Sequence, residues 1–262
     1  MKTSNFKNLY THKFHLVSVS PWPFLISWNL LLFMMNFIKM IHHKSMIWLI
    51  FCTILILFIL FQWWRDTSRE HTIGEHSIST YINLKMGFLL FILSEIFFFL
   101  SFFWTYFHSS LNPFPEIGSN WPPMNIISLN PSFIPFLNTT ILLSSSITVT
   151  IAHHMMLNKK FKLSMIWLFI TITLGAIFTF FQLFEYFYAS FSFSDSVYGS
   201  IFFMATGFHG LHVIIGTLFL LIAMIRMYLF HYSPYNMLSF EFSIWYWHFV
   251  DTIWLFLFML MY

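Results

Sequence analysis

The sequence has 262 residues, of which 58% are hydrophobic and only 8% are charged, whereas an average soluble domain has roughly 25% charged residues. Twelve Lys and Arg and nine Asp and Glu cannot cover the surface of a water-soluble fold of this size, so we expect a multi-spanning membrane protein. The formal net charge of +3 is small and scattered, which argues against nucleic-acid binding, and the single cysteine, Cys52, excludes an internal disulfide and a cysteine-cluster metal site.

Seven runs of the chain are long and apolar enough to cross about 30 Å of hydrocarbon, which requires ~20 residues of helix. In chain order they cover residues 22–38, 46–64, 86–107, 133–152, 163–184, 197–225 and 240–262. Lipid offers no partner to unpaired backbone groups, and the aromatic runs do not alternate as barrel strands do, so these runs are predicted to be helices. The predicted fold class is an all-α integral membrane protein with seven transmembrane helices, in a single membrane domain over 1–262.

The distribution of Lys and Arg predicts how these helices are oriented. With seven spans, the N-terminal tail and the loops after the second, fourth and sixth helices share one side of the membrane. That side holds ten of the twelve basic residues, namely Lys2, Lys7, Lys13, Arg65, Arg69, Lys85, Lys159, Lys160, Lys162 and Arg226. Because basic loops stay on the inner side, we expect the N-terminus to face the cytoplasm or its organellar equivalent, the matrix.

Glu95 lies near the middle of the third predicted helix, among phenylalanines. An ionised and unpaired acid at that depth costs ~3 kcal/mol on insertion scales, so Glu95 must be protonated, paired or facing a polar crevice. A role as a proton-relay or lipid-contact residue is favoured over that of a neutral acid bonded to a nearby carbonyl, because an acid is costly to keep in this position.

Asp251 is the second acid that we expect to be buried within a span, and His248 lies three residues before it on the same helical face. A local hydrogen bond between the two can therefore satisfy the acid. Structural pairing between helices is the favoured interpretation of this residue.

The thirteen histidines raise the question of a haem or copper site. A haem-binding bundle needs spaced pairs of histidines matched on partner helices, which no predicted span provides, and a two-copper thiolate centre needs two cysteines. We therefore expect no metal ligands and no cofactor in this chain. His209 and His212, at i and i+3 of the sixth helix, are predicted to be helix-packing polar residues, like His248 and Asp251.

The inner end of the second predicted helix carries Trp63-Trp64-Arg65-Asp66, and Glu70 and His76 follow. An interfacial Trp followed by Arg suits a phospholipid headgroup, with the ring at the membrane boundary and the guanidinium on the phosphate. Arg226, at the inner end of the sixth helix, offers a second phosphate partner. Ordinary snorkelling anchorage explains the same pattern equally well.

Several segments resemble the family of mitochondrial cytochrome c oxidase subunit three, in matching order and spacing from about His15 to the C-terminus. The segments that carry the resemblance are Ser20-Pro21-Trp22-Pro23, Gln62-Trp63-Trp64-Arg65-Asp66, Ser94-Glu95-Ile96-Phe97-Phe98-Phe99, Phe103-Trp104, Phe107-His108-Ser109-Ser110-Leu111, Trp121-Pro122-Pro123, Ala152-His153-His154, Ser196-Val197-Tyr198-Gly199-Ser200, Ala205-Thr206-Gly207-Phe208-His209-Gly210-Leu211-His212-Val213-Ile214-Ile215-Gly216 and Trp245-Tyr246-Trp247-His248-Phe249-Val250-Asp251.

The resemblance implies a subunit of the respiratory-chain haem–copper oxidase in the mitochondrial inner membrane, a complex that transfers electrons from cytochrome c to oxygen and pumps protons. It implies seven helices, with the first two splayed from a bundle of the other five. Haem and copper are then expected in partner subunits and not in this chain. Such a chain binds phospholipids and supports the assembly, stability and proton uptake of the catalytic subunit.

The resemblance also implies roles for single residues. Glu95 matches the carbodiimide-reactive acid of the family. The positions that match phospholipid contacts are Trp63, Trp64, Glu70, His76 and Arg226. Glu75 departs from the family pattern, because vertebrate relatives have His there.

An independent proton-coupled transporter that uses Glu95 and Asp251 is the alternative hypothesis. No internal repeat is visible in the sequence, which weakens this alternative, since many transporters are built from duplicated halves.

Overall fold

The computed structural model describes residues 15, 17–74, 76–115, 118–234 and 236–262. Seven helices and no β-strand occur in these ranges, which confirms the predicted all-α class. The N-terminal lysines used for the orientation and the departure at Glu75 lie outside the described residues.

The helices are α1 (Trp22–His43), α2 (Ile47–Ile73), α3 (Ile78–Leu111), α4 (Ile134–Leu157), α5 (Phe161–Tyr188), α6 (Val197–Tyr228) and α7 (Leu238–Met261). All seven are long and apolar enough to cross a membrane. Each one extends past its predicted apolar run at one end or at both. With its 34 residues, α3 is ~51 Å long at 1.5 Å per residue, which exceeds the ~30 Å hydrocarbon layer.

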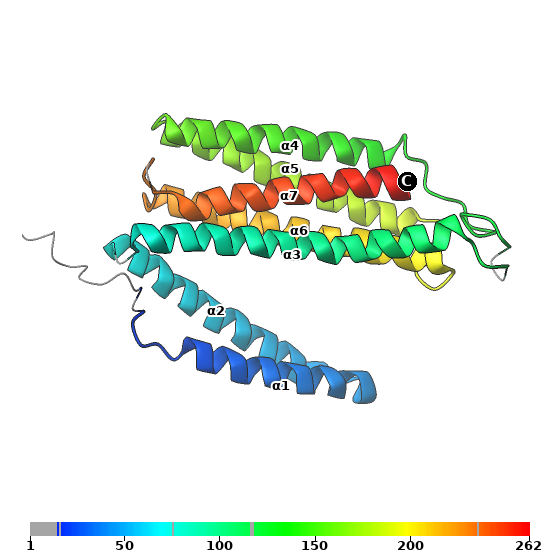
Figure 1. Ribbon diagram of the computed structural model, residues 1–262, viewed down its shortest axis with the longest axis horizontal. Coiled ribbons are helices and arrows are strands. Elements are labelled where there is room, and N and C mark those ends of the chain that lie inside the picture. Colours follow the sequence, from blue (N-terminus) through cyan, green and yellow to red (C-terminus); the bar gives the residue numbers. More distant parts are fainter. Residues whose placement is uncertain (1–14, 16, 75, 116–117, 235) are drawn as a thin grey trace, which may run out of the picture. The chain divides into compact units, whose positions relative to one another are not determined.

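The chain divides into two compact units, Met1–Lys85 and Met86–Tyr262. In the first unit, α1 and α2 pack side by side (Figure 1). Two polar contacts join them: Trp22 Nε1 donates to Asp66 Oδ2 at 2.7 Å, and Asn36 Nδ2 donates to Cys52 Sγ at 3.5 Å. Most other side chains of both helices are apolar, and many of these apolar side chains are exposed, as expected where a helix faces lipid.

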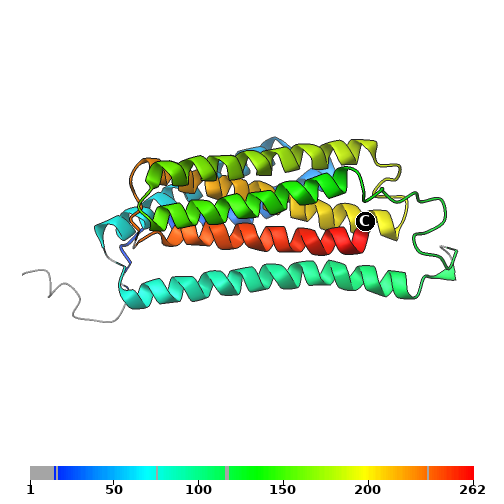
Figure 2. The same cartoon turned by 90° about the horizontal axis from the view of Figure 1, so that it is seen from above.

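In the second unit, α4, α5, α6 and α7 form a closed ring, because α4 packs on α5, α5 on α6, α6 on α7 and α7 on α4 (Figures 1 and 2). Trp247 of α7 is fully buried, and its Nε1 donates to Ser145 Oγ of α4 at 2.9 Å. Gly175 of α5 and Gly216 of α6 lie against its ring, and a Cβ on Gly216 would lie 3.0 Å from Trp247 Cε3. Two small residues therefore make room for one large indole.

The part of α3 in the second unit contacts α6 and α7 through long aromatic side chains. Phe88 stacks on Phe242 with ring centroids 4.4 Å apart, and Phe98 meets Phe208 edge to face at 5.0 Å. Such aromatic pairs add packing energy beyond the burial of their area. They hold the face of α3 that carries Glu95 against α6.

The loop between α5 and α6 is ordered by a carboxylate. Asp195 accepts hydrogen bonds from Ser192 N and from Ser192 Oγ, both at 2.7 Å. These bonds hold the pKa of Asp195 below its ordinary value of 3.8, since they favour the charged form. Ser196 then caps α6, because its Oγ accepts from Gly199 N at 3.2 Å.

Candidate functional site

Glu95 of α3 and His212 of α6 form a hydrogen-bonded pair, with Oε2 and Nε2 2.9 Å apart. The second ring nitrogen of His212, Nδ1, lies 2.6 Å from the carbonyl oxygen of Phe208, one helical turn earlier. The pair lies among the rings of Phe99, Tyr246 and Phe249. The side chains of Glu95 and His212 are 24% and 9% exposed, so neighbouring side chains enclose most of the pair.

The hydrogen bonds of His212 determine how many protons the pair holds. A backbone carbonyl only accepts, so Nδ1 must carry a proton that it donates to Phe208. The contact between Nε2 and Glu95 then needs one further proton, either on the carboxyl or on the imidazole. Both arrangements are neutral overall, and they differ by the transfer of one proton over 2.9 Å.

The sequence singled out Glu95 and His212 separately and did not pair them. They are 117 positions apart, and only the packing of α3 on α6 brings them together. An unpaired acid at membrane depth is energetically unfavourable, and in the structure His212 is the hydrogen-bond partner that reduces this cost for Glu95.

The other three residues predicted to be helix-packing polar residues lie between α6, α7 and α4. His209 is fully buried, and its Nε2 lies 3.2 Å from the carbonyl oxygen of Val250. His248 Nδ1 lies 2.9 Å from Ser146 Oγ of α4, and not against Asp251 as the local hydrogen bond would require. Asp251 is buried next to Ser146, without a hydrogen bond of good geometry among the described residues. Their predicted helix-packing role stays a prediction, which the contacts of His209 and His248 support.

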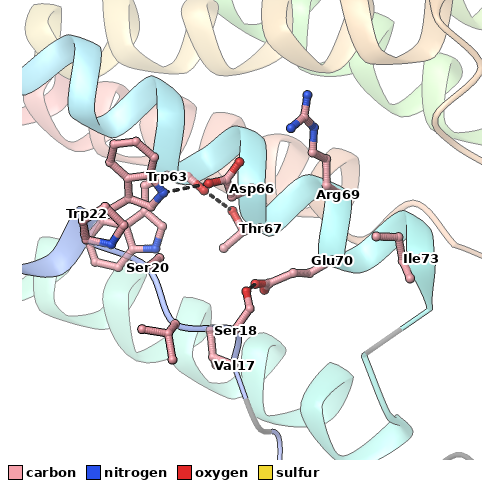
Figure 3. Close-up of a pocket in the computed structure, with 12 residues that line it drawn as sticks. Val17, Ser18, Ser20, Trp22, Trp63, Asp66, Thr67, Arg69, Glu70 and Ile73 are labelled. Atoms are coloured by element: carbon pink, nitrogen blue, oxygen red, sulfur yellow. Dashed lines mark hydrogen bonds between the residues drawn. The ribbon is translucent and has the colours of Figure 1, made fainter.

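A pocket of about 310 Å³ lies in the first unit, between the segment that leads into α1 and the last turns of α2 (Figure 3). Trp63 and Glu70, two of the residues predicted to contact phospholipid, line this pocket. Trp64 is not one of its lining residues and is 59% exposed. The α1 side contributes Trp22, which the sequence did not single out as a site residue.

Both signs of charge and two indole rings meet in this pocket. Asp66, which lines the pocket, accepts from Trp22 Nε1 and from Nη2 of Arg65, a residue outside the lining, at 3.0 Å. Arg69 also lines the pocket, and Glu70 accepts from Ser18 Oγ at 2.8 Å (Figure 3). A cation, carboxylates and indoles at the end of an apolar helix are the groups that a zwitterionic lipid headgroup meets at a membrane surface.

His76 lies in the connection between α2 and α3, which begins at Gly74, a residue with a φ of 90° that ends α2. The connection brings His76 close to His15 and Glu70, so that one ligating atom of each lies within 4.8 Å of the others. The sequence does not suggest this cluster, because its three residues lie outside the predicted spans and His15 is far from the other two along the chain.

Arg226, the remaining predicted lipid contact, lies near the end of α6 in the second unit. Its Nη1 donates to Ser239 Oγ at 2.6 Å, and its guanidinium lies 4.8 Å from the centroid of the Tyr232 ring. Burial raises the pKa of Tyr232, and the charge of Arg226 opposes that rise. Arg226 is therefore held in a fixed position by α7 and by the α6–α7 connection.

Comparison with known proteins places these features in a family. The model of the family "Cytochrome c oxidase subunit III" matches residues 12–262. Cytochrome c oxidase subunit 3 of Rhipicephalus sanguineus is 52% identical over 252 residues, which is 96% of this chain and 98% of that protein. The subunits of the same name from Drosophila melanogaster and Canis lupus familiaris are 48% and 47% identical, over 96% of this chain and 96% and 97% of theirs. The chain belongs to the cytochrome c oxidase subunit III family.

Proposed function

We propose that this chain is a lipid-binding core subunit that contains no redox centre and supports the assembly, stability and proton uptake of the catalytic subunit. As a member of its family it is a multi-pass subunit of cytochrome c oxidase in the mitochondrial inner membrane. The oxidation of cytochrome c and the reduction of oxygen then take place on haem and copper in partner subunits.

The Glu95–His212 pair is the observation that carries the proton-linked part of this proposal. Because both protonation arrangements of the pair are neutral, a proton can move between carboxyl and imidazole without leaving a net charge among aromatic rings. The chain can therefore keep an acid at membrane depth at small cost. An acid held in this way can respond to the charge of a neighbouring subunit.

The pocket of the first unit supports the lipid-binding part. Its Arg69 offers a guanidinium to a phosphate, and Glu70 offers a carboxylate to a headgroup amine. The rings of Trp22 and Trp63 lie at the Asp66 end of the same pocket (Figure 3), as interfacial tryptophans lie at the level of headgroups. Trp64, His76 and Arg226 are further lipid contacts under this proposal.

The test is to replace the pocket's cation in the assembled oxidase. Arg69→Gln should lower the number of phospholipids retained per purified complex, as counted by mass spectrometry of extracted lipid. Lys44→Gln is the matched control, because Lys44 is an exposed cation of the same unit, next to the other end of α1. Equal lipid content in both variants and in the unmodified complex would contradict lipid binding at this pocket.

The transporter alternative makes the opposite prediction about the chain alone. A proton-coupled transporter using Glu95 and Asp251 would move substrate across liposomes that contain only this chain. The family membership favours an oxidase subunit instead, for which we expect no flux.

A further inference from the structure

An acid, an amide and a phenol lie together inside the second unit, near the ends of α5 and α7. Tyr262 Oη donates to Glu185 Oε1 at 2.5 Å, and Gln182 lies one helical turn before Glu185 on the same face of α5. Glu185 and Gln182 are only 3% and 5% exposed. We propose that Gln182, Glu185 and Tyr262 bind internal water, and that the carboxyl of Glu185 is protonated in this site.

Three buried atoms of this group have no hydrogen-bond partner among the described residues, namely Gln182 Oε1, Gln182 Nε2 and Glu185 Oε2. The hydroxyls of Tyr186 and Tyr262 lie near the Gln182 amide, yet neither forms a hydrogen bond of good geometry with it. Buried polar atoms nearly always bond to protein or to ordered water. Water both donates and accepts hydrogen bonds, so it suits all three atoms.

The two neighbouring tyrosines do not supply the donor that Gln182 Oε1 needs. Thr206 gives its single hydroxyl proton to a backbone carbonyl one turn earlier at 2.6 Å, so Tyr186 must be the donor in its 2.6 Å contact with Thr206 Oγ1. The hydroxyl proton of Tyr262 goes to Glu185. Both tyrosine protons are therefore engaged elsewhere, which leaves water as the donor.

The charges of the second unit favour a neutral carboxyl at Glu185. The Lys and Arg of this unit are Lys159, Lys160, Lys162 and Arg226. Lys162 lies ~35 Å from Glu185 along α5, at 1.5 Å per residue, and Arg226 lies near the far end of α6. The titratable side chains beside Glu185 are Tyr186 and Tyr262, which are uncharged near neutral pH. Because burial penalises the charged form of an acid and no cation of this unit offsets that penalty, the protonated form is favoured.

A second buried amide lies at the same level of the unit. The antiparallel helices α4 and α5 pack side by side, and Thr148 Oγ1 lies 2.8 Å from Thr171 Oγ1 (Figure 1). Asn138 is ten residues before Thr148, so this register places it level with Gln182 to within about one residue. Asn138 is fully buried, and neither polar atom of its amide has a partner in the described part of the chain. Together with the three atoms above this makes five unpartnered atoms, which about two water molecules with ~3 hydrogen bonds each can satisfy.

This site gives the chain a second acid that holds a proton, besides the Glu95–His212 pair. Glu185 lies three residues before the end of α5, a rise of ~4.5 Å, so water and protons reach it across about one helical turn. The inference goes beyond the proposed function, and it does not depend on lipid binding at the pocket of the first unit.

Infrared difference spectra of the intact oxidase test the protonation of Glu185. Glu185→Gln should remove one carbonyl band of a protonated carboxylic acid, and the same band should shift in D₂O. Asp195→Asn is the matched control, because Asp195 is an exposed acid whose hydrogen bonds with Ser192 favour the charged form, so that its replacement should remove a carboxylate signal instead.

A second pair of variants tests the contact between Tyr262 and Glu185. Tyr262→Phe should move the Glu185 band to higher frequency, because the carbonyl of the acid loses a hydrogen bond. Tyr228→Phe should leave the band in place, since Tyr228 is an exposed tyrosine at the end of α6.

The water is measured without any substitution. In an electron-density map of the unmodified oxidase, at a resolution that shows ordered water, water should lie within hydrogen-bond distance of Gln182 and of Glu185 Oε2. Gln182→Leu should displace at least one of these water molecules, because it removes both polar atoms of the amide. A map without water at these atoms, or carboxylic acid bands that are the same in Glu185→Gln and in the unmodified complex, would overturn the proposal.

Discussion

Removing His212 tests the Glu95 pair more sharply than removing Glu95 itself. In His212→Leu the carboxyl of Glu95 loses its partner at 2.9 Å and remains among aromatic rings. Leaving a buried polar group unsatisfied costs about 1–3 kcal/mol. The free energy of unfolding of the second unit should fall by that amount, which is roughly a 5- to 150-fold change in its folding equilibrium.

Glu95→Gln should behave differently. The Gln amide can donate to His212 Nε2 while Nδ1 still donates to Phe208, so the hydrogen bonds of the pair survive. We expect a loss below about 1 kcal/mol, normal assembly and only modestly slower proton uptake, because the catalytic centres lie in another subunit.

The assay is the fraction of purified oxidase that keeps this chain during graded detergent treatment, followed by proton uptake in reconstituted vesicles. His154→Leu is the control, since it replaces an exposed histidine of α4. The reasoning is refuted if His212→Leu and Glu95→Gln lose the chain equally easily. Complete loss of electron transfer in a fully assembled Glu95→Gln complex would refute it as well.

Three further predictions concern other parts of the chain. Arg226→Ala should lower the anionic phospholipid retained by the purified complex, because it removes a guanidinium that Ser239 holds in place; lipid mass spectrometry measures this. Gly216→Val should destabilise the second unit by about 1–3 kcal/mol, since its side chain would press on the Trp247 ring; detergent-challenged complexes should then lose the chain sooner. The Asp195 loop should be fully stabilised above pH 3.8 and should lose this stabilisation as the pH falls through the lower folded-state pKa; hydrogen exchange at the Ser192 amide should accelerate over that range.

Each of these three predictions has a control variant and a result that would contradict it. Arg226→Lys keeps the charge and should keep more lipid than Arg226→Ala, and equal lipid in both and in the unmodified complex would count against a phosphate contact. Gly207→Val provides a helical glycine of α6 whose Cβ would meet only Tyr186 Oη at 3.8 Å, so it should be tolerated better than Gly216→Val. Asp195→Asn should remove the pH response of the loop, and an unchanged response would show that another group is responsible.

The seven helices could be predicted from the sequence, whereas their ends could not. An apolar run that is long enough to cross the membrane must form a helix, because lipid offers no hydrogen-bond partners to its backbone groups. Helices continue into polar residues, however, where the hydropathy signal stops. At the start of α3, Lys85 interrupts the apolar run, yet the helix begins earlier, at Ile78, and the ammonium of Lys85 lies 4.7 Å from the centroid of the Tyr81 ring. A snorkelling side chain thus ends an apolar run without ending the helix.

The site could be predicted only where one residue is informative by itself. Glu95 is visible in the sequence because an acid at membrane depth is costly. Its partner His212 cannot be identified from the sequence. The two residues are 117 positions apart, and only the packing of α3 on α6 makes them neighbours. The same holds for the bond between Trp22 and Asp66, and for the histidines that flank α1 and α2, which only the fold brings together.

Selective removal of this chain from purified oxidase tests the central claim most directly. Haem and copper are counted per complex before and after the removal, together with phospholipid and the rate of proton uptake. We predict unchanged haem and copper, continued electron transfer, fewer bound lipids and slower proton uptake. Haem or copper that leaves in a one-to-one ratio with the chain would contradict the account.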